Sequence, residues 1–397
     1  MEDNQISQLA ELSKRESRII LGLMSGTSMD GLDMALCRIT GIGSQTEIEL
    51  LEFSTRPYSL EYTEQLKDII SVPQVSLQDL CVMNTYMGDY TASCILEMLD
   101  HWGWQPEEVD IIASHGQTIY HAPKSKHGQE GMPNATLQMG DGDHIAHNTG
   151  ILTVSDFRQK HTAAGGEGAP LAALIDRIVF VDSEKDRILL NIGGIANFTF
   201  VQAASSNHSS LTADTGPGNT LMNEAAQRLL GQPFDDKGET ARSGETNSRL
   251  LKELKSDRYF DLTLPKTTGL ERFSWDYVQQ ACRKADATQL PAEDLLATLT
   301  TLTADTIAEA IRKVDSSSPM EVLVTGGGLH NSYLMELLQQ KMPDCAFKSF
   351  SELYFNPDAK EAACFAVLAN EALAGKGFNI AGTQKERLHL GKISFPD

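Results

Sequence analysis

The sequence predicts an α/β fold of two domains, and three observations lead to this prediction. The chain has 397 residues, more than one domain usually contains. The expected order of three strands, helix, strand, helix, strand and helix occurs twice, although no direct sequence repeat is visible. Several strands end in glycine-rich turns. Two stacked α/β domains with a cleft between them fit this order, and we expect them at residues 1–183 and 184–397.

The first domain is expected to open with a polar lead-in and a hairpin. Residues 19–24 are apolar and predict a buried strand, and Ser76 followed by Asp79 is a capping-box pattern that opens a long helix. Residues 124–134 are polar and predict an exposed loop. The elements expected, in order, are strands 19–24, 32–39 and 47–53, helix 60–70, the long helix from 76, strand 110–114, a helix near 144, strand 152–155 and an apolar helix 171–180.

The second domain is expected to repeat this order around one interruption. Residues 232–290 are polar and charged without a regular pattern, so we expect an irregular insertion, whose role the sequence leaves open. Gly375 follows the last helix as a C-terminal stop. The elements expected are strands 188–192, 198–201 and 211–213, a helix ending at 230, helix 291–314, strand 321–325, helix 333–340, strand 345–348 and helix 359–374.

Composition excludes several classes of partner. Lys and Arg number 33 against 54 Asp and Glu, and the net charge of −21 argues against nucleic acid or an anionic membrane as the main partner. No run of 18 apolar residues predicts a membrane span, and the polar N-terminus carries no signal-peptide core. The six cysteines are scattered without a CxxC pair, which predicts reduced thiols in a cytoplasmic protein.

The turn from Ser25 to Gly31 is suited to anion binding. Small residues let backbone N–H groups approach a phosphate, and the hydroxyl groups add donors. The carboxylates of Asp30 and Asp33 would repel a bare phosphate, so they make sense if a divalent cation lies between them. The alternative is an ordinary hairpin with a turn rich in Ser and Thr.

Glycine-rich turns follow strands at five places, namely 25–31, 165–168, 193–194, 216–218 and 326–328. Each alone is explained by a tight turn, but together they favour nucleotide binding at strand ends. The sequence has no GxxxxGK[ST] motif, no HRD or DFG, no GxSxG and no HExxH. A P-loop enzyme, a protein kinase, a serine hydrolase of the GxSxG type and a zincin are therefore not expected.

Asp156 is the best candidate for a catalytic base. It ends a short apolar strand beside a glycine-rich stretch, and Arg158 would lie on the same side and keep the carboxylate ionised. The alternative is a structural Asp–Arg pair. His115, Gln117 and Thr118 follow another strand and suit contacts to a sugar-like ligand, although a lone histidine there is more often structural. Glu361 is a ligand contact or merely an acid at a helix N-terminus.

Taken together, the motifs resemble one family. These are GLMSGTSMDGLD, ASHGQTIYHAP, DFR with GGEGAPL, LNIGGIANFT, ADTGPGN, VTGGGLHN and NPDAKEAACFAVLA, in order from Gly22 to Leu373. They closely resemble the anhydro-N-acetylmuramic acid kinase family, within the superfamily of acetate and sugar kinases, Hsp70 and actin. The resemblance implies two ribonuclease-H-like domains flanking a nucleotide- and sugar-binding cleft.

The resemblance also implies an activity. Water would open the 1,6-anhydro ring of 1,6-anhydro-N-acetylmuramic acid, a product of peptidoglycan turnover, and O6 would receive the γ-phosphate of ATP. The products would be N-acetylmuramic acid 6-phosphate and ADP. One alternative is a plain sugar or carboxylate kinase of the superfamily. A second is an ATP-driven binding module, for which no substrate-binding domain is expected after the last motif. A homodimer is plausible for the family.

The family motifs imply a set of site residues. By resemblance Asp156 is the general base that activates water for attack at the anomeric carbon. Mg²⁺ would be held by Asp30 and Asp214, with Asp33 as a further candidate, through water. The ATP-binding residues implied are Gly26, Thr27, Ser28, Met29, Asp30, Gly31, Leu32, Asp33, Gly193, Gly194, Asp214, Gly216, Gly218, Gly326 and Gly327. The sugar-binding residues implied are His115, Gln117, Arg158 and Glu361.

Overall fold

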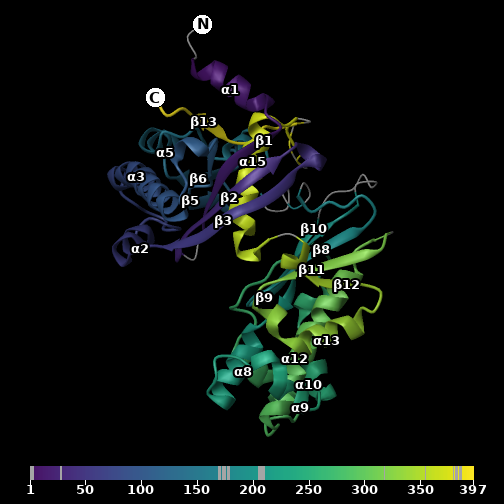
Figure 1. Cartoon of the computed structure of the whole chain (residues 1–397). Helices are drawn as coiled ribbons and strands as arrows, with labels where there is room; N and C mark the ends of the chain where they lie inside the picture. Colours follow the sequence, from purple (N-terminus) through teal and green to yellow (C-terminus); the bar gives the residue numbers. More distant parts are fainter. Residues whose placement is uncertain are drawn as a thin grey trace. The chain divides into compact units, whose positions relative to one another are not determined.

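A computed structural model describes most of the chain (Figure 1). The described residues are 4–26, 29–168, 171, 176, 179–203, 211–316, 318–353, 355–378, 380, 383 and 387–397. Contacts divide the chain into two compact units, Met1–Val179 with Asp358–Asp397, and Phe180–Pro357. The first break lies close to the predicted boundary after residue 183. The second break differs from the prediction, because residues 358–397 pack with the first unit and not with the second.

The sheet of the first unit has the strand order β13-β7-β4-β1-β2-β3. The first three strands form an antiparallel meander, β4 and β7 run parallel to β1, and β13 pairs antiparallel with β7. The bounds are β1 (Ser17–Ser25), β2 (Gly31–Thr40), β3 (Glu47–Pro57), β4 (Ile111–Ser114), β7 (Thr153–Ser155) and β13 (Lys392–Ser394). A separate hairpin is made by β5 (Gln117–Ala122) and β6 (Ala135–Met139).

The sheet of the second unit repeats the core of this order as β10-β9-β8-β11-β12. Its first three strands are again an antiparallel meander, and β11 and β12 run parallel to β8. The bounds are β8 (Asp186–Ile192), β9 (Ile195–Val201), β10 (Leu211–Pro217), β11 (Met320–Thr325) and β12 (Ala346–Ser349). The α/β prediction is confirmed, and both sheets have the strand order of a ribonuclease-H-like domain.

Helices cover these sheets. The first unit contains α1 (Gln5–Lys14), α2 (Leu60–Lys67), α3 (Leu77–Trp102), α4 (Lys124–His127), α5 (Gly142–Thr149), α6 (Gln159–Ala163) and α15 (Lys360–Leu373). The second contains α8 (Thr220–Leu230), α9 (Glu239–Ser243), α10 (Ser248–Leu254), α11 (Trp275–Lys284), α12 (Ala292–Arg312), α13 (Ser332–Lys341) and α14 (Phe350–Leu353). Ser76 caps α3 as expected, since its hydroxyl accepts from the Asp79 N–H at 3.4 Å. The predicted helix 171–180 lies mostly outside the described residues.

The prediction of an irregular insertion at 232–290 was wrong. This stretch forms α9, α10 and α11, and its apolar residues enter the core of the second unit. Leu250, Leu254, Tyr259, Phe273 and Val278 are all at most 1% exposed. These residues are separated by charged ones, so short helices and turns can each bury one apolar face, which a scan for long periodic segments overlooks. The predicted exposed loop 124–134 likewise contains the short helix α4.

Helix α15 explains why the end of the chain belongs to the first unit. It lies against β1, β2 and β4, and Figure 1 shows it in yellow across the purple strands. A Cβ atom at Gly22 of β1 would come 1.9 Å from the carbonyl oxygen of Ala362, so this approach requires glycine. At the other end of α15, buried Arg18 donates to Asn370 Oδ1 at 2.8 Å, and the Gly43 N–H donates to Glu371 at 2.6 Å.

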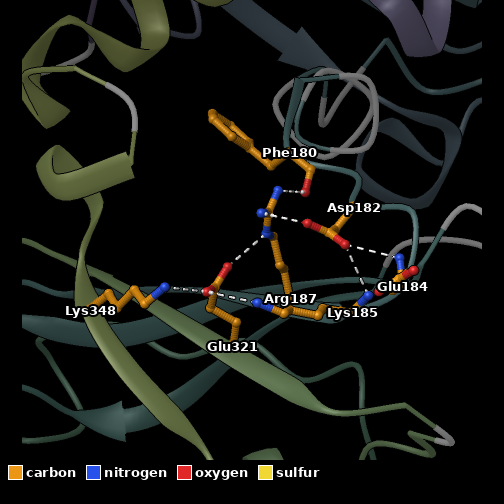
Figure 2. Close-up of polar contacts among 7 residues, drawn as sticks. All are labelled: Phe180, Asp182, Glu184, Lys185, Arg187, Glu321 and Lys348. Atoms are coloured by element: carbon orange, nitrogen blue, oxygen red, sulfur yellow. Dashed lines mark hydrogen bonds and ion pairs between the residues drawn. The ribbon is translucent and has the colours of Figure 1, made fainter.

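A buried ion cluster lies where strands β8 and β11 of the second unit begin (Figure 2). Glu321 of β11 accepts from Arg187 Nε at 3.0 Å and from Lys348 Nζ at 2.8 Å. Arg187 also donates to the Phe180 carbonyl at 3.1 Å and to Asp182 at 2.8 Å. The cluster thereby fixes the segment by which the chain enters this unit. Burial alone would raise the pKa of Glu321, but the bonds from Lys348 and Arg187 outweigh it and hold this pKa below its ordinary value.

We predict that Glu321→Gln lowers the free energy of unfolding by about 3 kcal/mol at pH 7, because two cations lose their buried partner. Since folding lowers the pKa of Glu321, its contribution is complete above the ordinary value of 4.5 and is lost as the pH falls below it. Denaturant unfolding of both proteins from pH 7 to pH 3 should therefore show the difference shrinking. Glu336→Gln, which breaks the exposed pair with Arg242, is the control and should change stability much less. Equal effects of the two variants would contradict the structure.

Candidate active site

The predicted phosphate turn is a strand–turn–strand hairpin. β1 and β2 pair as far as Ser25 opposite Leu32, and the turn lies between them. Met29 has φ +55° and its N–H donates to the Gly26 carbonyl at 3.3 Å. A Cβ atom at Gly31 would lie 2.7 Å from the Arg56 carbonyl oxygen, so the turn packs tightly on β3. Thr27 and Ser28 lie outside the described residues. Asp30 is exposed, while Leu32 is buried.

Asp33, on β2 beside the turn, sits among other carboxylates. Its Oδ1 accepts a hydrogen bond from Thr55 at 2.5 Å. Burial raises its pKa, and the nearby Asp30 and Asp358 carboxylates add to the rise, which exceeds the opposing effect of Thr55. A cation would relieve this repulsion, which is the fit expected for Mg²⁺ with the phosphates of ATP. Among the described residues, no group of three Asp, Glu, His or Cys could by itself hold a metal ion.

Gln117 is buried against this hairpin and is not exposed to solvent. It is 2% exposed, and its Oε1 accepts from the Ser25 hydroxyl at 2.5 Å. Its Nε2 donates to the Gly26 carbonyl at 3.4 Å, and the Ser25 hydroxyl also meets the Tyr58 hydroxyl at 2.6 Å. Both ends of the amide thus brace the turn. The structure favours a positioning role for Gln117 over the predicted sugar contact.

Asp156 follows β7 in a conformation unusual for a residue with a side chain. Its φ is +51°, a region that costs of the order of 1–2 kcal/mol. Its Oδ2 pairs with Lys392 Nζ of β13 at 2.5 Å, while its Oδ1 is buried and has no hydrogen-bond partner among the described residues. The alternative of a structural pair with Arg158 is not what the structure shows. One oxygen is held and the other is free to accept a proton, as a base requires.

His115 orients Arg158. The Nδ1–H of His115 donates to the Gly116 carbonyl at 2.7 Å, and Nε2 accepts from Arg158 Nε at 3.0 Å. Burial, reinforced by the Arg158 charge, lowers the pKa of His115 to about 3, so the ring is neutral. The ring also packs on Phe365 of α15, with centroids 4.9 Å apart. Both ring nitrogens are used, so His115 positions Arg158 and has no free atom for a sugar.

Glu361 joins this group from the first turn of α15. Part of its side chain is exposed, but desolvation of its carboxylate raises its pKa, and the nearby charges of Asp33 and Asp176 add to the effect. The Glu361 charge in turn acts on Arg158, whose pKa burial lowers. Glu361 therefore lies within electrostatic reach of both Asp33 and Arg158, which come from two other parts of the chain.

Two buried polar atoms were missed by the sequence analysis. His121 Nδ1 and Gln138 Oε1, on the β5–β6 hairpin, are buried without a hydrogen-bond partner among the described residues. The Arg158 charge lowers the pKa of His121, second to burial. Only the local motif HGQTIYH pointed to this hairpin, and nothing in the sequence shows that its strands pair. These atoms are candidates for contacts to a hydroxylated ligand.

Three predicted glycine turns of the second unit meet at one place. The N–H groups of Gly218 and Asn219 donate to the carbonyls of Gly194 and Gly193 at 2.8 and 2.7 Å. At Gly326, where φ is +81°, a Cβ atom would lie 2.8 Å from the Ile192 carbonyl oxygen. These contacts bring the ends of β8 and β11 beside the start of α8. The N-terminus of a helix at such a junction suits a phosphate.

A cavity of about 690 Å³ adjoins this junction within the second unit. It is lined by Asn219 and Gly327 of the glycine turns, by Phe234 and Lys237 of the supposed insertion, and by His330. The volume lies in the range of small-molecule sites. The sequence analysis missed most of these residues, because it took residues 232–290 for an insertion and stopped at the glycines of the 326–328 turn.

Comparison with known proteins identifies the family. A family model described as anhydro-N-acetylmuramic acid kinase matches residues 18–395. The chain belongs to the anhydro-N-acetylmuramic acid kinase family. Relatives with this name include proteins of Pseudoalteromonas atlantica, 45% identical over all of both chains, and of Caldanaerobacter subterraneus, 37% identical over 98% of this chain and 100% of that one. The predicted resemblance is confirmed.

Solved structures are more distant. The activator of 2-hydroxyisocaproyl-CoA dehydratase from Clostridium difficile, with bound ADPNP, has a TM-score of 0.41 at 11% identity, covering 89% of this chain and 95% of that one. A ROK family glucokinase from Streptomyces griseus has a TM-score of 0.36 at 11% identity, covering 88% and 98%. As a member of the anhydro-N-acetylmuramic acid kinase family the chain is a phosphotransferase, and the alternative of a different sugar or carboxylate kinase of the same superfamily is not favoured. Among the described residues no helix combines the length and the apolar character needed to cross a bilayer.

We predict that His115 stays neutral, with its proton on Nδ1, between pH 5 and pH 8, because a charged ring would be buried against Arg158. Proteins labelled with ¹⁵N at histidine would show this in the ring nitrogen shifts, and His115→Phe would assign the signals. Protonation of His115 within this range would contradict the arrangement.

Proposed function

We propose that this chain opens the 1,6-anhydro ring of 1,6-anhydro-N-acetylmuramic acid with water and transfers the γ-phosphate of ATP to O6, in the cytoplasm. The observation that carries the proposal is Asp156, a carboxylate with one oxygen held by Lys392 and the other buried and unbonded. A kinase that acts on an existing hydroxyl needs no general base to activate water, whereas ring opening by hydrolysis needs one.

Asp156 acts as the general base in the ring-opening step. Asp156 Oδ1 takes a proton from water, and the water oxygen bonds to C1 of the sugar as the bond from C1 to O6 breaks. The electron pair of that bond stays on O6, which attacks the γ-phosphorus, and ADP leaves. The anhydro bridge thus becomes a C1 hydroxyl and an O6 phosphate. Arg158 and Glu361, which lie within electrostatic range of each other, are proposed to bind the sugar. His115 positions Arg158, and Gln117 positions the 25–31 turn.

Glycine-rich turns of both units are proposed to bind the nucleotide. We propose that the 26–33 hairpin contacts the phosphates and that the turns at 193–194, 216–218 and 326–327 bind the nucleotide beside the cavity. Mg²⁺, contacted through water by Asp30 and Asp214, would neutralise phosphate charge. The carboxylates crowded at Asp33 fit a divalent cation, and the N-terminus of α8 at the glycine junction fits a phosphate.

The test is an assay of ADP release with Mg-ATP and the anhydro sugar, N-acetylmuramic acid, or no sugar. We expect ADP only with the anhydro sugar, and a product with the mass of sugar plus phosphate plus water. In H₂¹⁸O the label should appear at C1 and not in the phosphate. A phosphorylated intact sugar would instead support an ordinary kinase, and ADP release without any sugar would support an ATP-driven module.

Asp156→Asn should lower kcat by about 10²- to 10⁴-fold and leave ATP binding unchanged, because an amide takes no proton from water. Asp143→Asn, which alters an acid in the first turn of α5, is the control and should have normal turnover. Near-normal turnover of Asp156→Asn would refute the assignment of the base.

A further inference from the structure

Asp214 lies in an irregular part of strand β10, whose pairing with β9 does not by itself fix the position of Asp214. β10 is an edge strand, and its pairing with β9 is interrupted by a shift in register between Asp214 and Gly216. Gly216 has φ +147°, which belongs to the same irregularity. A bulge at a sheet edge changes the direction in which a side chain points. It also removes hydrogen bonds between the strands that would keep this direction fixed.

One short segment replaces these missing bonds. Lys266 accepts from the Asp214 N–H at 2.9 Å through its carbonyl, and the Tyr259 hydroxyl donates to the Asp214 carbonyl at 2.8 Å. The Thr268 N–H donates to Asp214 Oδ2, also at 2.8 Å. The backbone N–H, the backbone carbonyl and one carboxylate oxygen of Asp214 are therefore all held by residues 259–268.

Lys266 holds this segment together. Its side chain is 7% exposed, and its Nζ donates to the Tyr259 carbonyl at 3.1 Å and lies 4.2 Å from the centre of the Tyr259 ring. The Tyr259 ring also packs edge-on against Phe273. Burial of an amine is costly unless its bonds are made, so this arrangement is well defined.

We infer that Tyr259, Lys266 and Thr268 form a clamp that positions Asp214 toward Mg-nucleotide. The inference rests on the proposed function, since it gives Asp214 its ligand. Oδ2 is fixed by Thr268, and the structure gives Oδ1 no hydrogen bond to a described residue, so Oδ1 is the oxygen left for a metal-bound water. The segment first taken for an insertion thereby has a role at the nucleotide site.

The test compares two tyrosines of the same unit. Tyr259→Phe removes the hydroxyl that bonds the Asp214 carbonyl but keeps the ring, and Tyr277→Phe removes a hydroxyl that bonds the Leu254 carbonyl instead. Binding of a non-hydrolysable ATP analogue, without sugar, is measured by calorimetry with and without Mg²⁺. We expect Tyr259→Phe to weaken Mg²⁺-dependent binding about tenfold, the low end of what loss of an outer partner costs a metal site. Tyr277→Phe should bind as the unaltered protein does.

A second pair keeps the test decisive if Tyr259→Phe folds poorly. Lys266→Met removes the bond to the Tyr259 carbonyl, and Lys313→Met removes one to the neighbouring Phe260 carbonyl, whose residue has no side-chain donor for Asp214. Only Lys266→Met should raise the KM for Mg-ATP, with a smaller change in kcat. Equal behaviour within both pairs would overturn the clamp while turnover by the unaltered protein upholds the proposed function. Failure of the unaltered protein to bind the Mg-nucleotide would overturn both.

Discussion

The close packing of α15 on β1 is the constraint on which the arrangement of this chain depends. Gly22 and Ala362 are far apart in sequence, and any side chain at Gly22 would meet the Ala362 carbonyl. The chain leaves the first unit near residue 180, builds the whole second unit, and returns at residue 358 to make this contact. The same helix carries Glu361 and Phe365, so it also delivers a carboxylate and the ring on which His115 packs.

Each of three carboxylates of the candidate site has a partner that engages one of its two oxygens. The chain has a net charge of −21, and these acids differ from most of its other acids in having specific partners within the site. Asp156 has Lys392, Asp214 has the Thr268 N–H, and Asp33 has Thr55. Each of these partners engages one oxygen of its carboxylate. A carboxylate held in this way keeps its direction and can still accept a proton or a metal-bound water.

Much of the fold and of the glycine-rich turns could be predicted because the signals are local. Apolar runs that end in glycine are visible in the sequence, and they correctly gave most strands of both sheets. The residues 232–290 were misread, because Tyr259 and Phe273 become core residues only when α12 and β10 surround them. The role of Gln117 was also not readable, since its partners Ser25 and Gly26 lie in another strand and turn.

The sequence by itself determined the α/β class, the repeated order of elements, the family and the identity of Asp156 as the candidate base. These follow from motifs whose residues are neighbours in the chain. Only the tertiary structure decided that residues 358–397 pack with the first unit, that Lys392 pairs with Asp156, that His115 serves Arg158, and that Asp214 is held by residues 259–268. The physical reason is that each of these contacts joins segments far apart in sequence, and hydrogen bonds and close packing of that kind leave no periodic pattern in either segment.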